Sequence, residues 1–110
     1  MKIDLLQGTL DVLILKALSW GSLHGYAIVR WIGRTTEDVL RIEEGALYPA
    51  LHRMERRGWI EAEWGMSEKN RKAKFYRLTD EGRRALNAES DTWQRYAHAV
   101  GKVLHAVQEA

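Results

Sequence analysis

The stretch EGALYPALHRMERRGWI, residues 44–60, contains an amphipathic helix that runs directly into a strand-like segment. At 100° per residue, residues 45–57 place an apolar stripe on one side and a polar, largely basic face on the other. The stripe is Leu47, Ala50, Leu51 and Met54, and the opposite face is Tyr48, Pro49, His52, Arg53 and Arg56. Proline is tolerated in a first helical turn, so the helix is expected to begin a few residues before Pro49. Gly58, which can take positive φ, is expected to end it, leaving one face to pack and the other to meet an anionic partner.

Two shorter helices are expected before this one. The first opens near Thr9, ends at Trp20 and Gly21, and carries its apolar residues at the spacing of one helix face: Leu10, Leu13, Ile14, Ala17 and Leu18. The second is expected to be capped by Ser22, to stop at Gly33, and to direct inward Ala27, Ile28, Trp31 and Ile32. Residues 35–44 fit either a loop or a partial helix.

After Gly58 the apolar residues recur with a period of two. Ile60, Ala62 and Trp64 alternate with Trp59, Glu61 and Glu63. Residues 73–78 alternate again, and the segment between them is polar and turn-like. This pattern predicts a β-hairpin. Thr79 is then expected to cap a final helix that continues nearly to the C-terminus, with acidic residues in its first turn.

The order of three helices, a β-hairpin and a long helix is that of a winged helix-turn-helix. The predicted fold class is therefore mainly α with a small β-hairpin, with residues 1–79 as a DNA-binding domain and residues 80–110 as a C-terminal dimerisation helix. In this fold the third helix is the recognition helix, which enters a major groove wide enough to admit it.

Four segments together resemble the PadR-like transcriptional regulators, specifically the short subgroup with a single C-terminal helix. They are GTLDVLILKAL (8–18), LHGYAI (23–28), EGALYPALHRMERRGWIEAEW (44–64) and RKAKFYRLTDEGRRAL (71–86). From Asn87 onward the match is in position and helical character more than in letters. The resemblance implies a homodimeric DNA-binding repressor, often responsive to small aromatic or cationic compounds, with the last helix forming the dimer contact.

The recognition helix supplies one set of expected DNA contacts: Tyr48, Pro49, His52, Arg53 and Arg56. Tyr48 is expected to position a phosphate, His52 and Arg53 to meet base edges, and Arg56 to touch the backbone. The alternative is a solvated face whose basic residues stabilise the negative end of the helix dipole.

The hairpin tip supplies a second set, because the run KNRKAKFYR contains five basic residues and no acid. The expected contacts are Lys69, Arg71, Lys72 and Lys74, directed at phosphates or a minor groove. The alternative is a tip whose charges only keep the hairpin soluble and block edge-to-edge aggregation.

The last helix carries apolar residues at heptad spacing, interrupted by Ser90, with a second apolar strip beside them. A small domain could not cover both, so a homodimer is expected, with the interface residues Leu86, Trp93, Tyr96, Ala97, Val100, Leu104 and Val107. The alternative is that this stripe packs on its own domain. Trp93 is the candidate ligand residue, since a two-fold seam would place it near its symmetry mate; simple packing is the alternative.

Composition limits the remaining function classes. The chain has 110 residues, a net charge of +2 and no cysteine, and its apolar run at residues 10–18 is too short to cross a bilayer, so a cytoplasmic protein is expected. The four histidines lack metal-ligand spacing, and no catalytic or Gly-rich phosphate motif occurs. No enzyme, metal or cofactor is expected. The predicted function is a sequence-specific regulator, a repressor that binds a pseudo-palindromic operator as a homodimer and is released by a small aromatic ligand. A winged-helix protein–protein interaction module is the alternative.

Overall fold

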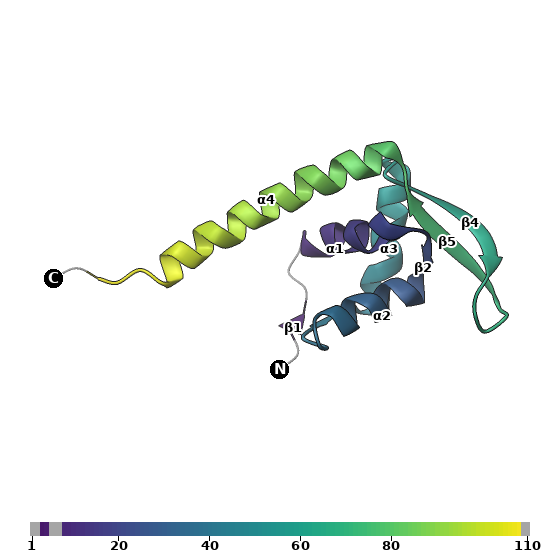
Figure 1. Ribbon diagram of the computed structural model, residues 1–110, viewed down its shortest axis with the longest axis horizontal. Coiled ribbons are helices and arrows are strands. Elements are labelled where there is room, and N and C mark those ends of the chain that lie inside the picture. Colours follow the sequence, from purple (N-terminus) through teal and green to yellow (C-terminus); the bar gives the residue numbers. More distant parts are fainter. Residues whose placement is uncertain (1–2, 5–7, 109–110) are drawn as a thin grey trace.

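The computed structural model describes residues 3–4 and 8–108, and these form a winged helix-turn-helix (Figure 1). Helix α1 (Thr9–Ala17) continues into a 3-10 turn, η1 (Leu18–Trp20), and is followed by α2 (Gly25–Thr35) and α3 (Glu44–Arg56). Strands β4 (Ile60–Met66) and β5 (Lys72–Leu78) form the hairpin that precedes α4 (Asp80–Leu104). The predicted fold class is confirmed.

The core lies where the first three helices meet the base of the hairpin. The apolar stripe predicted for α3 is fully buried there, with Leu47, Ala50, Leu51 and Met54 each at most 2% exposed. Around it pack Ile14, Leu15, Leu18, Ile28, Ile32, Ile60 and Tyr76. Burial of these side chains stabilises the arrangement of α3 and leaves its polar face turned outward.

The hairpin is part of a sheet with a third strand that the sequence did not indicate. Strand β2 (Leu23–His24) pairs antiparallel with β5, which gives the order β2-β5-β4. A separate parallel pair joins β1 (Ile3–Asp4) to β3 (Leu40–Arg41). Both β2 and β3 have only two residues, too few to show a period of two in the sequence.

Both predicted ends of the second helix are wrong. Its cap is His24, whose Nδ1 accepts a hydrogen bond from the backbone N–H of Ala27 at 3.2 Å, because Ser22 precedes the strand that pairs with β5. The helix also continues through Gly33 to Thr35, and a helix interior tolerates a glycine at modest cost. The ambiguous segment after it is a turn, with Glu37 and Asp38 at positive φ, followed by β3.

Helix α3 begins at Glu44, so Pro49 lies in its second turn and not in its first. Gly58 follows the helix with φ of 77°, as expected for the residue that ends it.

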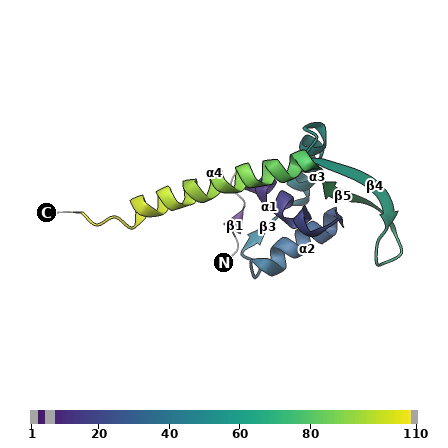
Figure 2. The same cartoon turned by 45° about the horizontal axis from the view of Figure 1, so that its top comes forward.

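Helix α4 begins on the core and then leaves it (Figures 1 and 2). The Thr79 hydroxyl oxygen accepts from the N–H of Gly82 at 3.0 Å, which confirms the predicted cap. The helix ends at Leu104, earlier than expected, where His105 Nδ1 lies 2.8 Å from the carbonyl oxygen of Gly101. Val107 therefore lies outside the helix that was expected to contain it.

Candidate nucleic-acid interface

The outward face of α3 holds the predicted recognition residues. Tyr48, Pro49, His52, Arg53 and Arg56 are all exposed, because the buried stripe fixes the rotation of the helix. The Tyr48 ring is about half exposed, and its hydroxyl lies over Gly25 at the start of α2. A Cβ at Gly25 would lie 3.0 Å from that hydroxyl oxygen, so the glycine makes room for the tyrosine.

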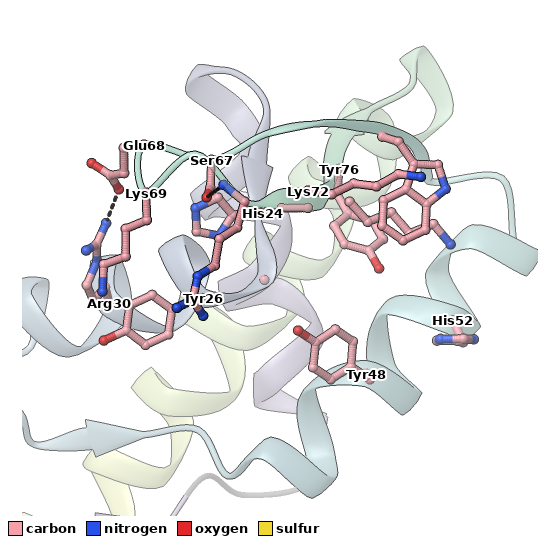
Figure 3. Close-up of a pocket in the computed structure, with 15 residues that line it drawn as sticks. His24, Tyr26, Arg30, Tyr48, His52, Ser67, Glu68, Lys69, Lys72 and Tyr76 are labelled. Atoms are coloured by element: carbon pink, nitrogen blue, oxygen red, sulfur yellow. Dashed lines mark hydrogen bonds and ion pairs between the residues drawn. The ribbon is translucent and has the colours of Figure 1, made fainter.

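This face divides into two sides. Tyr48 and His52 point toward the wing, defined as the hairpin of β4, β5 and the turn at residues 67–71 (Figure 3). Arg53 is directed the other way, toward α1, where its Nη2 donates to Asp11 Oδ1 at 2.9 Å. This ion pair holds the guanidinium on the α1 side of the helix, where one of its nitrogens is engaged by a carboxylate. The structure therefore separates Arg53 from His52, which the sequence had grouped with it for base contact.

A groove of about 590 Å³ lies between α3, α2 and the wing (Figure 3). Its basic side chains are Arg30, Lys69, Arg71, Lys72 and Lys74, and its aromatic side chains are Tyr26, Tyr48, Trp64 and Tyr76. Cations in a concave site raise the local positive potential and attract anions. The groove brings Tyr48 and His52 of the recognition helix together with the predicted wing contacts, whereas Pro49, Arg53 and Arg56 do not line it.

The four predicted wing residues all line this groove, but they are held differently. Lys72 Nζ lies 5.1 Å from the centre of the Trp64 ring, and Lys74 Nζ lies 3.9 Å from Glu55 Oε1 of α3. Arg77, the fifth basic residue of the run, lies outside the groove and pairs with Glu61 at 2.8 Å. The basic run thus has a groove side and an outer side.

Sequence reasoning missed several groove residues on α2 and at the wing tip. Tyr26 and Arg30 are one turn apart on the outward face of α2, and the guanidinium of Arg30 lies 5.1 Å from the centre of the Tyr26 ring. Arg30 Nη2 also donates to Glu68 Oε1 at 2.9 Å. The polar side of the helical pattern of α2 was a usable signal for Tyr26 and Arg30. Trp64, which the alternating pattern placed on the apolar side of its strand with Ile60 and Ala62, is 62% exposed.

Two groups in the groove have shifted acidities. The hydrogen bond and positive charge of Arg30 lower the pKa of the Glu68 carboxyl, which favours its ionised form. Burial, followed by the negative charge of Glu55, raises the pKa of the Tyr76 phenol, so this hydroxyl stays neutral. Neither group forms a catalytic arrangement with a nucleophile.

Six of the seven predicted dimer residues lie on α4, and Val107 follows the end of that helix (Figure 1). None of the seven lines the groove. Leu86 packs against the core of its own chain, whereas Trp93 is 43% exposed and Leu104 is 75% exposed. Tyr96, Val100 and Val107 are exposed as well, and Ala97 is partly buried. The uncovered apolar surface therefore begins at Trp93.

Within residues 3–4 and 8–108, no group of three or more His, Asp or Glu side chains is placed to hold a metal ion. None of the described helices combines the length and apolar character needed to cross a membrane.

Comparison with known proteins gives a consistent result. The model of the Transcriptional regulator PadR-like family matches residues 14–88. An uncharacterized protein of Lysinibacillus sphaericus is 31% identical over 105 residues, which are 96% of each chain. Among solved structures, a transcriptional regulator from Clostridium thermocellum superposes with a TM-score of 0.79 at 30% identity, over 87% of this chain and 93% of that one. A PadR family transcriptional regulator from Eggerthella lenta superposes with a TM-score of 0.76 at 34% identity, over 92% and 86%.

Proposed function

Because this chain belongs to the PadR-like family of DNA-binding transcriptional regulators, which are not enzymes, we propose that it represses transcription by binding a pseudo-palindromic operator as a homodimer. The observation that carries the proposal is the basic groove between α3 and the wing. One side of this protein groove is α3, a helix of the right size to enter a DNA major groove, and the other side is a hairpin able to reach the flanking DNA backbone.

The proposed contacts follow the two sides of α3. Tyr48 would position a phosphate at the mouth of the groove, and His52 would meet base edges, with Pro49 and Arg56 at the same helix surface. Arg53 would join them after exchanging Asp11 for a guanine or a phosphate. On the wing, the phosphate contacts would be Lys69, Arg71, Lys72 and Lys74.

The proposed dimer forms through residues 80–110. None of the residues that the structure describes covers the apolar surface that begins at Trp93, and a two-fold axis would bury this surface against a second copy. A dimer would present two recognition helices, which suits half-sites about one helical turn apart, roughly 34 Å.

Repression would follow from occupation of a promoter in the cytoplasm. We propose Trp93 as the residue that would contact a small aromatic effector at the dimer seam. Such an effector would release DNA only by binding better to a dimer with a different spacing of its recognition helices.

The test is fluorescence anisotropy with a labelled fragment of the protein's own promoter region and a scrambled duplex of equal length, at several salt concentrations. We expect tighter binding to the promoter, and a salt slope about 1.8 shallower when Lys72 and Lys74 are both changed to alanine, since each lost phosphate contact removes about 0.9. Arg77→Ala is the matched control, because it removes a basic residue from the outer side of the same hairpin. Equal weak binding to both duplexes, with a slope that the groove variants do not change, would refute the proposal.

A further inference from the structure

An ion pair crosses the groove and joins the wing tip to α2. Arg30 Nη2 donates to Glu68 Oε1 at 2.9 Å, between residues 38 positions apart in the chain (Figure 3). In Figure 3, Glu68 and Lys69 hang from the turn of the wing above Arg30 and Tyr26. The pair therefore lies inside the surface proposed to hold the DNA backbone.

Glu68 is the one carboxylate among the groove-lining residues that the structure describes, beside five Lys or Arg side chains. A carboxylate in such a surface repels phosphates and occupies a cation that would otherwise bind them. Its effect on binding thus depends on whether it stays in place when DNA arrives.

Arg30 is held more firmly than Glu68. Its guanidinium lies 5.1 Å from the centre of the Tyr26 ring, and its Nε atom is buried, without a hydrogen-bond partner among the described residues. The Glu68 side chain is 66% exposed and comes from the tip of a turn. The orientation of Arg30 therefore depends on α2 and Tyr26, whereas Glu68 is an anionic partner that another anion can replace.

The pair is also weak enough to be exchanged. Its side chains are 40% and 66% exposed, and ion pairs that face solvent contribute little net stability. A DNA phosphate offers the same planar donor a bidentate partner and releases a condensed counterion. Exchange of the carboxylate for a phosphate is therefore favourable at low salt.

We propose that Arg30 is a phosphate-binding residue and that Glu68 occupies the phosphate position in the free protein, to be displaced when the DNA backbone enters the groove. This inference rests on the proposed function, since it assigns a contact within the same interface. Glu68 then weakens DNA binding at every sequence, and Arg30 adds one phosphate contact from α2.

The alternative is a strut, in which the pair stays intact and holds the wing in position. The two models predict opposite effects of a Glu68 substitution on DNA affinity. Removing the Glu68 charge strengthens binding if the carboxylate is displaced, whereas it weakens binding if the pair positions the wing.

The experiment measures binding of the full-length protein to a labelled 24-base-pair duplex of mixed sequence, which requires no knowledge of the operator. The variants are Glu68→Gln, Arg30→Gln and the double variant, with salt slopes for each. Glu61→Gln is the matched control, because Glu61 is likewise a wing carboxylate that pairs with an arginine, Arg77, but it lies outside the groove. Arg30→Lys keeps the positive charge and shows whether a loss in Arg30→Gln comes from the missing charge or from a folding defect. The double variant Lys72→Ala, Lys74→Ala tests whether the wing contacts DNA at all.

We expect Glu68→Gln to bind about two- to fivefold more tightly, in line with the strength of an exposed ion pair, and Glu61→Gln to bind like the parent. Arg30→Gln should make the salt slope about 0.9 shallower, and Arg30→Lys should restore it. In the Arg30→Gln background the gain from Glu68→Gln should be smaller, because only the repulsion between Glu68 and the phosphates is then removed.

Weaker binding by Glu68→Gln, or the same gain with and without Arg30, would overturn the inference. If those results came with a salt slope that was still shallower in the Lys72→Ala, Lys74→Ala variant than in the parent, the proposed function would stand. Only the role of Arg30 would then fail. Absence of any salt-dependent duplex binding would remove both.

Discussion

Gly82 shows how one residue position supports the junction between the wing and α4. A Cβ at this position would collide with the carbonyl oxygen of Trp59, which belongs to the backbone and cannot rotate away. We expect Gly82→Ala to lower the free energy of unfolding by about 2 kcal/mol or more, because the helix must shift off the hairpin. Chemical denaturation followed by circular dichroism measures this loss.

The control for this prediction is Gly45→Ala, where a Cβ would meet no atom within 4 Å. Alanine at that helical position should stabilise the protein by about 0.5–1 kcal/mol through its higher helix propensity. A Gly82→Ala variant as stable as the parent would show that the contact with Trp59 is not tight.

Glu68 gives a prediction on pH. The hydrogen bond from Arg30 lowers the pKa of Glu68 in the folded protein. The contribution of this pair to the free energy of unfolding is therefore complete above the ordinary pKa of a glutamate, and it is lost as the pH falls through the lowered pKa. Carboxyl NMR titration should show the Glu68 pKa returning to its usual range in Arg30→Gln. Arg34→Gln, on the same helix but outside the groove, should leave it lowered; an unchanged Glu68 pKa in Arg30→Gln would contradict the pairing.

For single residues, the sequence predicts which side chains are buried better than it predicts which side chains form ion pairs. The stripe of α3 follows from helical periodicity, because burial is set by the face of the helix. Arg53 and Arg30 look equally free in the sequence, yet they pair with Asp11 and Glu68, residues 42 and 38 positions away. Such pairs depend on the docking of elements, which periodicity does not encode.

The start of α2 is the feature of element scale that the sequence misplaced. His24 serves both β2, which pairs with β5, and α2, which it caps. We expect His24→Ala to lower the free energy of unfolding by about 1 kcal/mol, since the N–H of Ala27 loses its acceptor. Thermal unfolding monitored by circular dichroism would measure the change.

Ser22→Ala is the control for this prediction, because Ser22 is the cap that the sequence favoured and the structure places before β2. It should change stability by less than about 0.5 kcal/mol, as surface substitutions usually do. A larger loss in Ser22→Ala than in His24→Ala would mean that the helix begins where the sequence placed it.

Helix α4 combines two environments along one stripe. Its first turns pack on α1 and the core through Gly82 and Leu86, and the same side of the helix then continues uncovered through Trp93 and Leu104. Heptad spacing predicted one seam along the helix, interrupted by Ser90, because sequence periodicity reports the side of a helix and not what lies opposite it. The point along α4 at which the stripe stops packing on its own chain can be seen only once the length of the domain beneath the helix is known.

For the whole molecule, the uncovered half of α4 makes the single chain elongated, with principal extents of 64 × 31 × 22 Å. An isolated helix of this kind is only marginally stable in water, since most helical stability in proteins comes from packing of an apolar face. A second copy would supply that packing and would link two recognition surfaces. DNA affinity and helix stability are thereby expected to depend on the same contact.

Val100→Lys tests this dependence, since it places a charge in the proposed seam of both copies. We expect the dimer dissociation constant to rise about 100-fold, measured by sedimentation equilibrium, because two lysines would be desolvated in one interface. His98→Lys introduces the same charge about 160° away around the helix, and it should leave the dimer intact. Binding to a promoter fragment should weaken with Val100→Lys, and recover at protein concentrations that restore the dimer, since two linked sites act at a high effective concentration. Undiminished self-association of Val100→Lys would place the dimer contact elsewhere, and unchanged DNA binding by a monomeric variant would mean that one recognition helix is sufficient.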